Sequence, residues 1–458
     1  MNALIALAAL AVLSLASEIS GFKRYTPALV VVGLLAVLGL NFADWNTDLT
    51  YYHKMMWYDN FAIAFTGVMT CSALLIMLLV PRFYETIETN RSESYAQMLF
   101  LLAGGVVMVS YGNLSMLFLG VEILSIASYI LAGSDKRNLY GNEASIKYFL
   151  MGAFSSAFLL LGIALIYAAS ASFDLVQIAA YVAKGNISGY MYIGILMTII
   201  AMAFKVSAAP FHFWAPDVYD GSPTIVTLTM STVVKVAAFG AMARLFSYAL
   251  LPVMPTFSGI LWIIIALTIA IGSMGAVFQT SFKRLLAYSG VANAGYLLLG
   301  VIVAQKTANS ALLYYAAAYN IATITSFVAM LLLSYKFDDD EITNFKGLAK
   351  KQPLLAIAVT IAMLSLAGIP PTAGFFGKYY LFTQAIQAGY TGLVVIAILG
   401  SLISVLYYFR VIINMYAPED SSKEILFDMP LAYKIVLIIT TALTALLGLF
   451  PDLLAGLI

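Results

Sequence analysis

The sequence predicts an all-α integral membrane protein, and three observations support that prediction. Of the 458 residues, 62% are hydrophobic and only 10% are charged, whereas an ordinary soluble domain has about 25% charged residues. The charges are grouped, which leaves apolar runs of about 18–25 residues between them, long enough for membrane-spanning helices. Mean hydropathy is +0.96. Because so few charges cannot cover a water-soluble protein of this length, we expect a chain almost entirely embedded in the bilayer.

The apolar runs predict about fourteen spans, each bounded by charged or turn-forming residues. The first run is expected to be a retained span and not a signal peptide, because Lys23 and Arg24 follow it instead of preceding it. In chain order the predicted spans are Met1–Ser17, Thr26–Ala43, Phe61–Pro81, Met98–Ser110, Leu114–Ala132, Ser145–Ala169, Met191–Ala209, Thr224–Tyr248, Ile260–Phe278, Leu285–Ala304, Ala311–Ser334, Pro353–Ala385, Leu393–Tyr416 and Ile435–Leu454.

Two of these spans, the seventh and the twelfth, are predicted to be broken. Pro210 follows Lys205 closely and lacks a backbone N–H, and Gly368, Pro370 and Pro371 interrupt the twelfth span. Interrupted spans at matching places in two halves of a chain indicate inverted repeats with an ion site at the breaks. We therefore expect a single transmembrane domain (1–458) that contains three N-terminal spans (1–95), a first five-helix repeat of spans four to eight (96–250), a second five-helix repeat of spans nine to thirteen (257–417) and a last span (430–458).

The distribution of lysine and arginine predicts the orientation of the chain. With the N-terminus placed outside, sixteen of these residues fall on the cytoplasmic side, and only Lys54, Lys184, Arg244 and Lys306 fall on the outer side. Together with the even number of predicted spans, this asymmetry predicts that both termini lie on the outer face.

Four ionisable residues remain inside predicted spans: Glu122, Lys205, Lys235 and Lys378. Each would cost about 2.5–3.5 kcal/mol at the centre of a lipid-facing helix, so these side chains must face protein or water. Ion pairs that merely hold spans together explain them poorly, because one negative charge cannot pair with three positive charges. We expect instead a chain of protonatable sites along an ion path.

Other polar residues are secondary candidates for the same path. His212 follows the predicted break in span seven, where it either relays protons or caps a loop. Glu143 and Lys147 are spaced i,i+4 and form a surface pair, a proton entry or a subunit contact. Tyr288 and Asn293 lie in an otherwise apolar span, where each either packs between helices or helps to hold a water wire.

The composition also excludes several classes of function. A single cysteine, Cys71, cannot build a disulfide framework or an iron–sulfur cluster, and His53 and His212 are too far apart to form a metal site with it. The sequence contains neither of the common glycine-rich nucleotide-binding fingerprints and no basic tract outside the loops, so nucleic acid is not an expected partner. Any redox chemistry is therefore expected on another chain.

Six segments match the motifs of a known family in order and with the right spacing. They are LFLGVEILS (Leu117–Ser125), EASIKY (Glu143–Tyr148), FKVSAAPFHFWAPDVYDGSPT (Phe204–Thr224), STVVKVAAFG (Ser231–Gly240), KRLLAYSGVANAGY (Lys283–Tyr296) and LSLAGIPPTAGFFGKYY (Leu364–Tyr380). Over its whole length the chain resembles the antiporter-like membrane subunits of respiratory complex I, the proton-pumping NADH:quinone oxidoreductase. Among these it is most similar to the N subunits: there is no long lateral helix as in L subunits, Lys378 stands where M subunits usually have glutamate, and PPTAGFFGKYY follows the N pattern.

The resemblance implies a function and a role for each ionisable residue. Electrons pass from NADH to quinone on partner subunits, which carry the FMN, the iron–sulfur clusters and the quinone, so no cofactor is expected on this chain of the translocase. Carried over by motif, Glu122 and Lys205 are expected to pair, Lys235 is the bridging lysine and Lys378 the terminal one. A change in the Glu122–Lys205 pairing then alters how tightly Lys205 holds its proton, which moves through Lys235 towards Lys378.

The implied surroundings are the bilayer of a bacterial-type inner (plasma) membrane and the other membrane-arm subunits, both adjacent antiporter-like subunits and small ones. Three alternatives stay open. A cation/proton antiporter or membrane-bound hydrogenase of the same fold would have a similar subunit, and its partner chains would distinguish it. A stand-alone metabolite transporter would need a substrate pocket with a counter-charge, and a membrane enzyme would need cofactor motifs. We favour protons over Na⁺, because no acid-rich oxygen cage is evident.

Overall fold

Apolar helices make up almost the whole molecule. The computed structural model describes residues 1–85, 91–337, 339–418 and 428–456. Within those residues, twelve helices are long and apolar enough to cross a membrane, and two more apolar helices are shorter, α9 (Gly189–Lys205) and α17 (Pro353–Ala367). The predicted all-α membrane fold is therefore confirmed.

The elements follow one another with short connections. The first part of the chain contains α1 (Asn2–Ile19), α2 (Thr26–Ala43), β1 (Leu49–Tyr51), β2 (Met56–Tyr58), α3 (Asn60–Met77), α4 (Val80–Phe83), α5 (Arg91–Ser110), α6 (Leu114–Ala132), α7 (Leu139–Ser170), α8 (Leu175–Ala183), α9 and α10 (Trp214–Gly221). A continuous helical column follows, made of α11 (Thr224–Thr229), the π-helical turn η1 (Met230–Val234), α12 (Lys235–Arg244) and the π-helical turn η2 (Leu245–Ala249). The remainder is the 3₁₀ turn η3 (Leu251–Val253), α13 (Met254–Val277), α14 (Phe282–Val303), α15 (Lys306–Leu333), the 3₁₀ turn η4 (Ile342–Phe345), α16 (Leu348–Lys351), α17, α18 (Ala373–Gln387), α19 (Thr391–Tyr416), α20 (Leu431–Leu449) and α21 (Asp452–Ala455).

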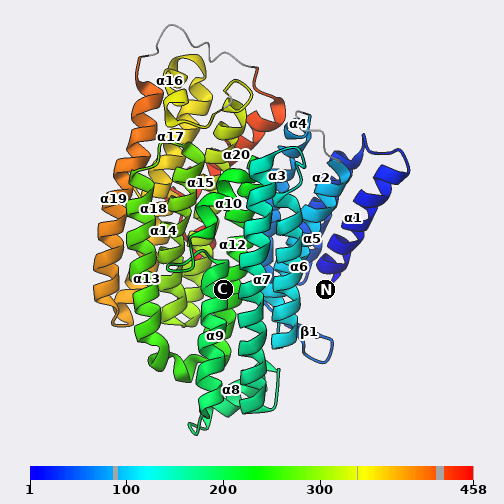
Figure 1. Cartoon of the computed structure of the whole chain (residues 1–458), viewed down its shortest axis with the longest axis vertical. Coiled ribbons are helices and arrows are strands. Elements are labelled where there is room, and N and C mark those ends of the chain that lie inside the picture. The colour runs from blue at the N-terminus through cyan, green and yellow to red at the C-terminus, as the bar shows by residue number, and fades with distance from the viewer. Residues whose placement is uncertain (86–90, 338, 419–427, 457–458) are drawn as a thin grey trace.

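Both predicted breaks are present. The seventh span ends as α9 at Lys205 and resumes as α10, and the twelfth ends as α17 at Ala367 and resumes as α18. In Figure 1, α9 reaches its break from the end of the molecule that carries α8, whereas α17 reaches its break from the opposite end, beside α16. The two interrupted spans therefore run in opposite directions.

The helices of the two predicted repeats pack in the same order. In spans four to eight, α5 packs on α6, α7 on α9, and α12 on α5; in spans nine to thirteen, the corresponding pairs are α13 with α14, α15 with α17, and α19 with α13. The first group contacts the second where α10 packs on α14 and where α11 packs on α15. The division of the chain into two five-helix repeats, and their inverted symmetry, stay predictions.

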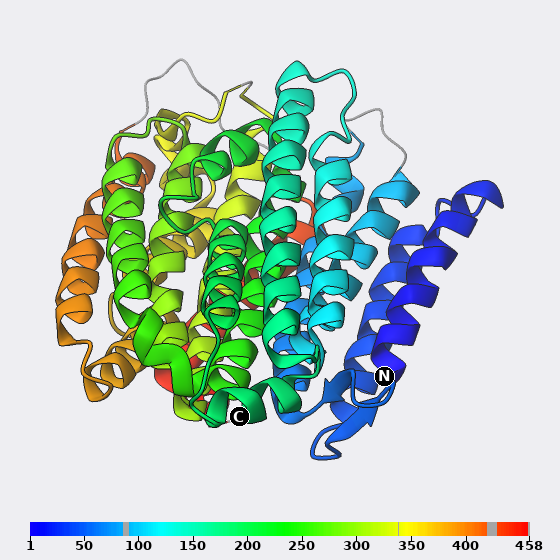
Figure 2. The same ribbon diagram turned by 60° about the horizontal axis from the view of Figure 1, so that its bottom comes forward.

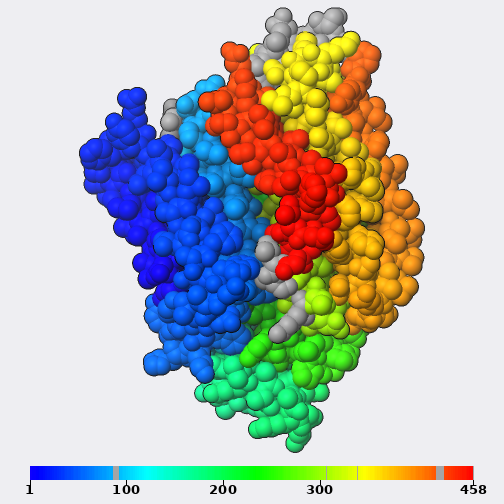
Figure 3. Space-filling model, turned by 180° about the vertical axis from the view of Figure 1, so that it is seen from behind, coloured from blue at the N-terminus to red at the C-terminus, as the bar shows by residue number. Residues whose placement is uncertain are grey.

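The two groups of helices extend from the first helices of the chain at one edge to α19 at the other. Helices α1 and α2 lie at one edge and α19 at the opposite edge (Figures 1 and 2). Seen from behind, the red C-terminal helices run between the blue N-terminal part and the yellow-orange α17–α19 (Figure 3). A hydrogen bond joins these C-terminal helices to the N-terminal part: the Tyr433 hydroxyl of α20 donates to Leu79 O (3.3 Å).

Small residues allow neighbouring helices to approach closely within each group. A Cβ atom on Gly104 of α5 would lie 2.6 Å from the backbone nitrogen of Leu124 on α6, and one on Gly162 of α7 would lie 2.8 Å from Gly194 O on α9. Backbones this close are typical of membrane helices that pack through small residues. The resulting tight pairs hold the helices that carry the ionisable residues.

Three features differ from the predicted boundaries. Helix α5 begins at Arg91 and α7 at Leu139, well before the predicted Met98 and Ser145, because their first turns are polar helix that a hydropathy window does not detect. The Asn138 side chain caps the start of α7, because it accepts hydrogen bonds from the backbone N–H groups of Tyr140 and Gly141. The β1–β2 hairpin and the amphipathic α8 lie in loops that the apolar pattern does not describe.

Candidate functional site

Three of the four ionisable residues singled out by the sequence are deeply buried. Lys205, Lys235 and Lys378 are 5%, 2% and 4% exposed, and Glu122 is half-buried. Within the described residues, no carboxylate oxygen lies within 4.0 Å of any of the three ammonium nitrogens. The lysines are therefore held by neutral groups, and the contacts differ from one lysine to the next.

Lys205 ends α9 and reaches across to α6. Its Nζ donates to Ser125 Oγ (2.6 Å) and lies over the rings of Tyr129 and Tyr148, 5.9 and 5.8 Å from their centroids. Cation–π attraction of this kind is strongest where the ring and the cation are removed from water. One hydroxyl and two ring faces are thus the immediate surroundings of this ammonium.

Glu122 does not form the expected direct ion pair with Lys205. It lies one turn before Ser125 on α6 and accepts a hydrogen bond from Ser156 of α7. A cavity of about 10 Å³, roughly the space of one water molecule, is lined by Lys205 together with Ser125 and Ser156. The expected direct pairing is thus not formed: Glu122 is bonded to Ser156, while Ser125 offers Lys205 a neutral acceptor.

Other groups cover the carbonyls exposed where α9 ends. The indole N–H of Trp214 donates to Phe204 O (3.2 Å), and Ser155 Oγ of α7 donates to Ala201 O (3.1 Å). The last carbonyls of a helix lack intrahelical partners, so such donors are needed at a buried end. Lys205 is consequently not required to close the break beside it.

Lys235 is the first residue of α12 and directly follows the π-helical turn η1. Its Nζ donates to Gly290 O of α14 (2.6 Å) and lies 5.4 Å from the ring centroid of Tyr319 on α15. A Cβ on Gly290 would lie only 2.9 Å from that Nζ, so the glycine leaves room for the ammonium. Isolated π-helical turns are frequent at functional sites, where they alter which residues face a neighbour.

Lys378 of α18 closes the second break itself. Its Nζ donates to Leu366 O and Ala367 O (both 3.0 Å) at the end of α17, and to Ser401 Oγ of α19 (3.1 Å). It also lies 4.7 Å from the ring centroid of Tyr296. Because the C-terminal end of a helix carries partial negative charge and free carbonyls, this is a favourable place for an ammonium.

Two of the secondary candidates, His212 and Tyr288, have no described contact with the ammonium nitrogens of the three lysines. His212 occupies the α9–α10 connection, where its carbonyl accepts from Ala215 N (2.9 Å) and its Nδ1 is buried without a hydrogen-bond partner among the described residues. Tyr288 packs its ring against Gly275 of α13. Neither residue has a described contact with Lys205, Lys235 or Lys378.

Glu143 and Lys147 do form the predicted i,i+4 ion pair, at 2.8 Å. Lys147 also reaches Asp217 of α10 (3.0 Å), which in turn lies 3.5 Å from Arg284 of α14. This network borders a cavity of about 650 Å³, into which Asp135 and Asp339 also project. The pair is therefore part of a charged network that connects three helices at the end of the molecule that carries α16.

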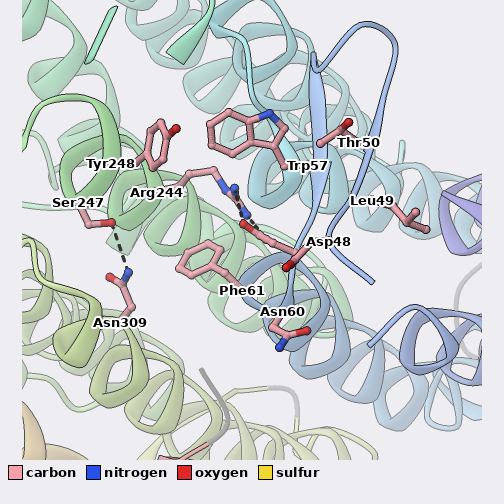
Figure 4. A pocket seen from close by; sticks show the side chains of 11 residues that line it. Asp48, Leu49, Thr50, Trp57, Asn60, Phe61, Arg244, Ser247, Tyr248 and Asn309 are labelled. Atoms are coloured by element: carbon pink, nitrogen blue, oxygen red, sulfur yellow. Dashed lines mark hydrogen bonds and ion pairs between the residues drawn. The ribbon is translucent and has the colours of Figure 1, made fainter. Parts of the chain in front are cut away.

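A buried ion pair at the opposite end was not predicted. Arg244 is 4% exposed and donates to both carboxylate oxygens of Asp59 (2.6 and 3.0 Å), whereas the orientation count only assigned it to the outer side, near the end of the eighth span. Its guanidinium lies over Trp57 and Phe61 beside a cavity of about 610 Å³ (Figure 4). Bidentate pairing of this kind is typical of a structural contact. The only sign of this ion pair in the sequence was Asp59, which stands at the N-cap of α3.

The tyrosines around the lysines were also missed. The ammonium groups of Lys205, Lys235 and Lys378 each lie over at least one tyrosine ring, and these rings come from α6, α7, α14 and α15. The sequence contains 29 tyrosines, and that abundance in an apolar chain was the available signal. Hydropathy could not assign individual rings to individual lysines, because the contacts join distant parts of the chain.

Comparison with known proteins identifies similar chains. A family model described as NADH:quinone oxidoreductase/Mrp antiporter, TM, matches residues 112–404. NADH-quinone oxidoreductase subunit N of Cytophaga hutchinsonii is 45% identical over 457 residues, covering 99% of this chain and 98% of the relative. The same subunit of Flavobacterium johnsoniae is 42% identical over 465 residues, covering 100% of both chains.

Solved structures show the same architecture. A chain of respiratory complex I from Thermus thermophilus with bound aureothin has a TM-score of 0.84 at 33% identity, covering 98% of each chain. A chain of the Mrp complex from Dietzia sp. has a TM-score of 0.86 at 21% identity, covering 100% of this chain and 96% of that one. At that lower identity the likeness concerns the fold alone.

Proposed function

The chain belongs to the NADH:quinone oxidoreductase/Mrp antiporter transmembrane family, within its subunit N group, and from this we propose that its buried lysines carry protons across the membrane. It is a multi-pass membrane-arm subunit of a multisubunit, bacterial-type complex I, and so part of a proton-translocating NADH:quinone oxidoreductase. The contacts of this chain's own residues support a route for the translocated protons.

The observation that supports the proposal is the set of contacts around the three lysines. A structural ion pair requires a carboxylate, as Arg244 has in Asp59. The Lys205 ammonium instead donates to a hydroxyl, and the Lys235 ammonium donates to a backbone carbonyl. The Lys378 ammonium donates to three neutral oxygens. Buried lysines without a counter-ion are costly to keep charged, and they readily exchange a proton.

The proposed sequence of steps begins at Glu122. A change in the position of the Glu122 carboxylate, or in its Ser156 contact, alters the electrostatic potential at Lys205, which lies beside the same small cavity. The proton released by Lys205 passes to Lys235 and from there to Lys378. The Glu143–Lys147 network and His212 are proposed as the approach from the cytoplasmic side, and Tyr288 as a flanking polar group.

The finer parts of the assignment are proposals as well. Electron transfer, with its FMN, iron–sulfur clusters and quinone, is placed on partner subunits, since the chain has one cysteine and two histidines. The direct neighbours are proposed to be other antiporter-like subunits and small membrane subunits. Both termini are proposed to lie on the outer face, so reporter fusions at Asp339 and at the C-terminus should give opposite sidedness.

The subunit of a cation/proton antiporter or a hydrogenase is a less well-supported alternative. The Mrp chain shares the fold at 21% identity, whereas relatives named as subunit N reach 45% identity over almost the whole chain. On its own in liposomes, the chain should show no NADH-dependent proton uptake, because the proposed energy source lies on partner subunits. Robust uptake by the isolated chain would contradict the proposal.

Replacement of the bridging lysine in the assembled complex tests the proposal directly. Lys235→Ala should lower NADH-driven quinone reduction and proton pumping at least about tenfold, which corresponds to about 1.4 kcal/mol in a barrier. Lys184→Ala, which removes an exposed loop lysine, is the matched control and should leave both rates unchanged. Wild-type pumping by an assembled Lys235→Ala complex would refute the lysine route.

A further inference from the structure

Two neighbouring helices connect the surroundings of Lys235 with those of Lys378. Gly290 of α14 and Tyr319 of α15 hold the Lys235 ammonium. One turn further along both helices, the Tyr315 hydroxyl donates to Asn293 Oδ1 (2.5 Å). Rising numbers on α14 match falling numbers on α15, so the two helices run antiparallel and present these groups as one buried stripe.

The next step along the same stripe reaches Lys378. Tyr296 follows Asn293 by three residues on α14 and places its ring under the Lys378 ammonium, 4.7 Å from centroid to Nζ. The rings of Tyr296 and Tyr315 meet edge to face, with centroids 6.4 Å apart. The Asn293–Tyr315 hydrogen bond therefore lies between the two lysines.

Further contacts on two sides fix the position of Asn293 and Tyr315. The Asn293 amide donates to Ser289 O (2.7 Å) and to the Tyr408 hydroxyl of α19 (3.4 Å). The Tyr315 ring packs against Gly377 of α18, where a Cβ would lie 2.5 Å from the ring. Both side chains are buried, at 2% exposure each, so this polar pair has a defined geometry inside an apolar protein.

The two partners differ in what they can do with a proton. A tyrosine hydroxyl both donates and accepts, so it can take up one proton while it releases its own. A side-chain amide does not exchange its hydrogens in this way and serves as an anchor. With its O–H directed at Asn293, the Tyr315 hydroxyl is held in one orientation and passes no proton onward.

We propose that Tyr315 relays protons between Lys235 and Lys378, and that Asn293 is the positioning residue that holds the Tyr315 hydroxyl. This inference rests on the proposed function of the lysines and names the group between two of them. In the step, the Lys235 ammonium gives up a proton, the Tyr315 oxygen takes it up, and the original Tyr315 proton moves on to the neutral Lys378 amine. Lys235 ends neutral, Lys378 ends as an ammonium, and the tyrosine is unchanged.

The step requires the Tyr315 O–H to turn away from Asn293, which makes their hydrogen bond the closed position of the relay. Gaps longer than a hydrogen bond are crossed through water molecules, which bridge polar groups at little cost. The relay thus depends on one hydroxyl and on the amide that orients it.

Tyr315→Phe tests the relay, and the neighbouring residue provides a matched control. Tyr314 is equally buried and also donates one hydrogen bond, but to Leu447 O of α20 (2.7 Å), away from the stripe. In the assembled complex, Tyr315→Phe should lower NADH-driven proton pumping at least about fivefold, roughly 1 kcal/mol in a barrier. Tyr314→Phe should retain the wild-type rate per assembled complex.

A second measurement separates a relay from a packing role. Solvent deuterium should slow turnover more in Tyr315→Phe and Asn293→Leu than in the wild type. The first change removes the relaying hydroxyl and the second no longer positions it between the two lysines, so in both a slowed proton step becomes rate-limiting. Tyr314→Phe should show the wild-type isotope effect. If Tyr315→Phe does not assemble, Asn293→Leu, which keeps the hydroxyl and the side-chain volume, carries this test.

Wild-type pumping together with a wild-type isotope effect in these variants would overturn the relay. If Lys235→Ala still abolishes pumping in that case, only the Tyr315 assignment fails. If Lys235→Ala also pumps normally, the proposed function of the lysines fails with it.

Discussion

The two interrupted spans use their lysines in opposite ways. At the end of α9, the Trp214 indole and the Ser207 N–H both donate to the carbonyl of Phe204, while Lys205 extends away from the break towards Ser125 on α6. At the end of α17, Lys378 itself donates to two carbonyls. One break is closed without its lysine, and the other is closed by its lysine.

This difference separates two kinds of buried charge. Lys378 has three oxygen acceptors, which match the three donors of an ammonium, so it both stabilises the fold and carries charge. Lys205 has one acceptor and two aromatic faces, so its charge depends more strongly on Glu122, which lies one turn before that acceptor on α6. A lysine that precedes a break and a lysine that follows one therefore need not have the same task.

The largest expected effect is at Lys378. Lys378→Met leaves the buried Leu366 carbonyl without its described donor, at about 1–3 kcal/mol for an unsatisfied group. The Ala367 carbonyl loses one of two donors, because the Ser401 hydroxyl still donates to it (3.0 Å). We expect less assembled complex, a lower inactivation temperature and loss of NADH-driven pumping. Native gels, thermal inactivation and pumping in membrane vesicles measure these three effects.

Lys378→Arg is the informative companion to that variant. A guanidinium can still donate to the α17 carbonyls but does not release a proton at ordinary pH. Assembly should therefore recover while pumping stays low. A Lys378→Met complex with wild-type thermal stability would show that the second break does not depend on its lysine.

The next largest effect is expected at Lys205, and it should concern activity alone. Lys205→Ala removes a donor only from Ser125, because Trp214 keeps the helix end covered. Assembly should be near normal, while quinone reduction and pumping should fall about tenfold, roughly 1.4 kcal/mol in a barrier. Lys205→Arg should rescue poorly for the reason given for Lys378. Normal rates in an assembled Lys205→Ala complex would favour a purely structural lysine.

A smaller effect, on stability alone, is expected at Trp214. Trp214→Phe keeps the ring that stacks on Tyr148 but leaves the buried Phe204 carbonyl without its indole donor. Phe204 O still accepts from the Ser207 N–H (3.0 Å), so the free energy of unfolding should fall by about 0.5–1.5 kcal/mol, seen as a lower inactivation temperature at nearly normal pumping. Trp262→Phe, at a partly exposed position on α13, is the control. A large loss of pumping without loss of stability would contradict this division of roles.

The sequence predicted the two broken spans and their charged residues, but it did not predict the groups that contact those residues. Hydropathy predicted the apolar helices, and proline and glycine predicted both breaks, because these signals are local in the chain. The cost of a charge in lipid singled out Glu122 and the three lysines, again from single positions. The partners of those lysines could not be predicted, since Ser125 and Tyr319 reach them from helices distant in sequence, and Ser401 reaches Lys378 from the next helix through a packing angle that hydropathy does not give.

The Glu122–Lys205 contact and the Arg244–Asp59 pair illustrate the same limit. The first was expected as an ion pair, but a serine on the same helix face intervenes. The second joins the ends of α12 and α3, residues 185 positions apart, and nothing in either segment indicates the other. Which charges meet depends on helix rotation and packing, and neither follows from hydropathy.

The smallest expected effect is also the sharpest comparison of the two lysines. Ser125→Ala removes the one hydrogen-bond acceptor described for Lys205, whereas Ser401→Ala removes one of three acceptors of Lys378. A hydrogen bond to a charged group contributes about 1.5–3 kcal/mol, and its loss matters most where no other acceptor remains. Ser125→Ala should therefore lower pumping about threefold and Ser401→Ala less than about 1.5-fold, at near-normal assembly in both. Equal effects of the two serine substitutions on pumping would mean that the number of acceptors does not distinguish the lysines. A larger effect of Ser401→Ala would mean that Lys378, despite its three acceptors, is the more sensitive site.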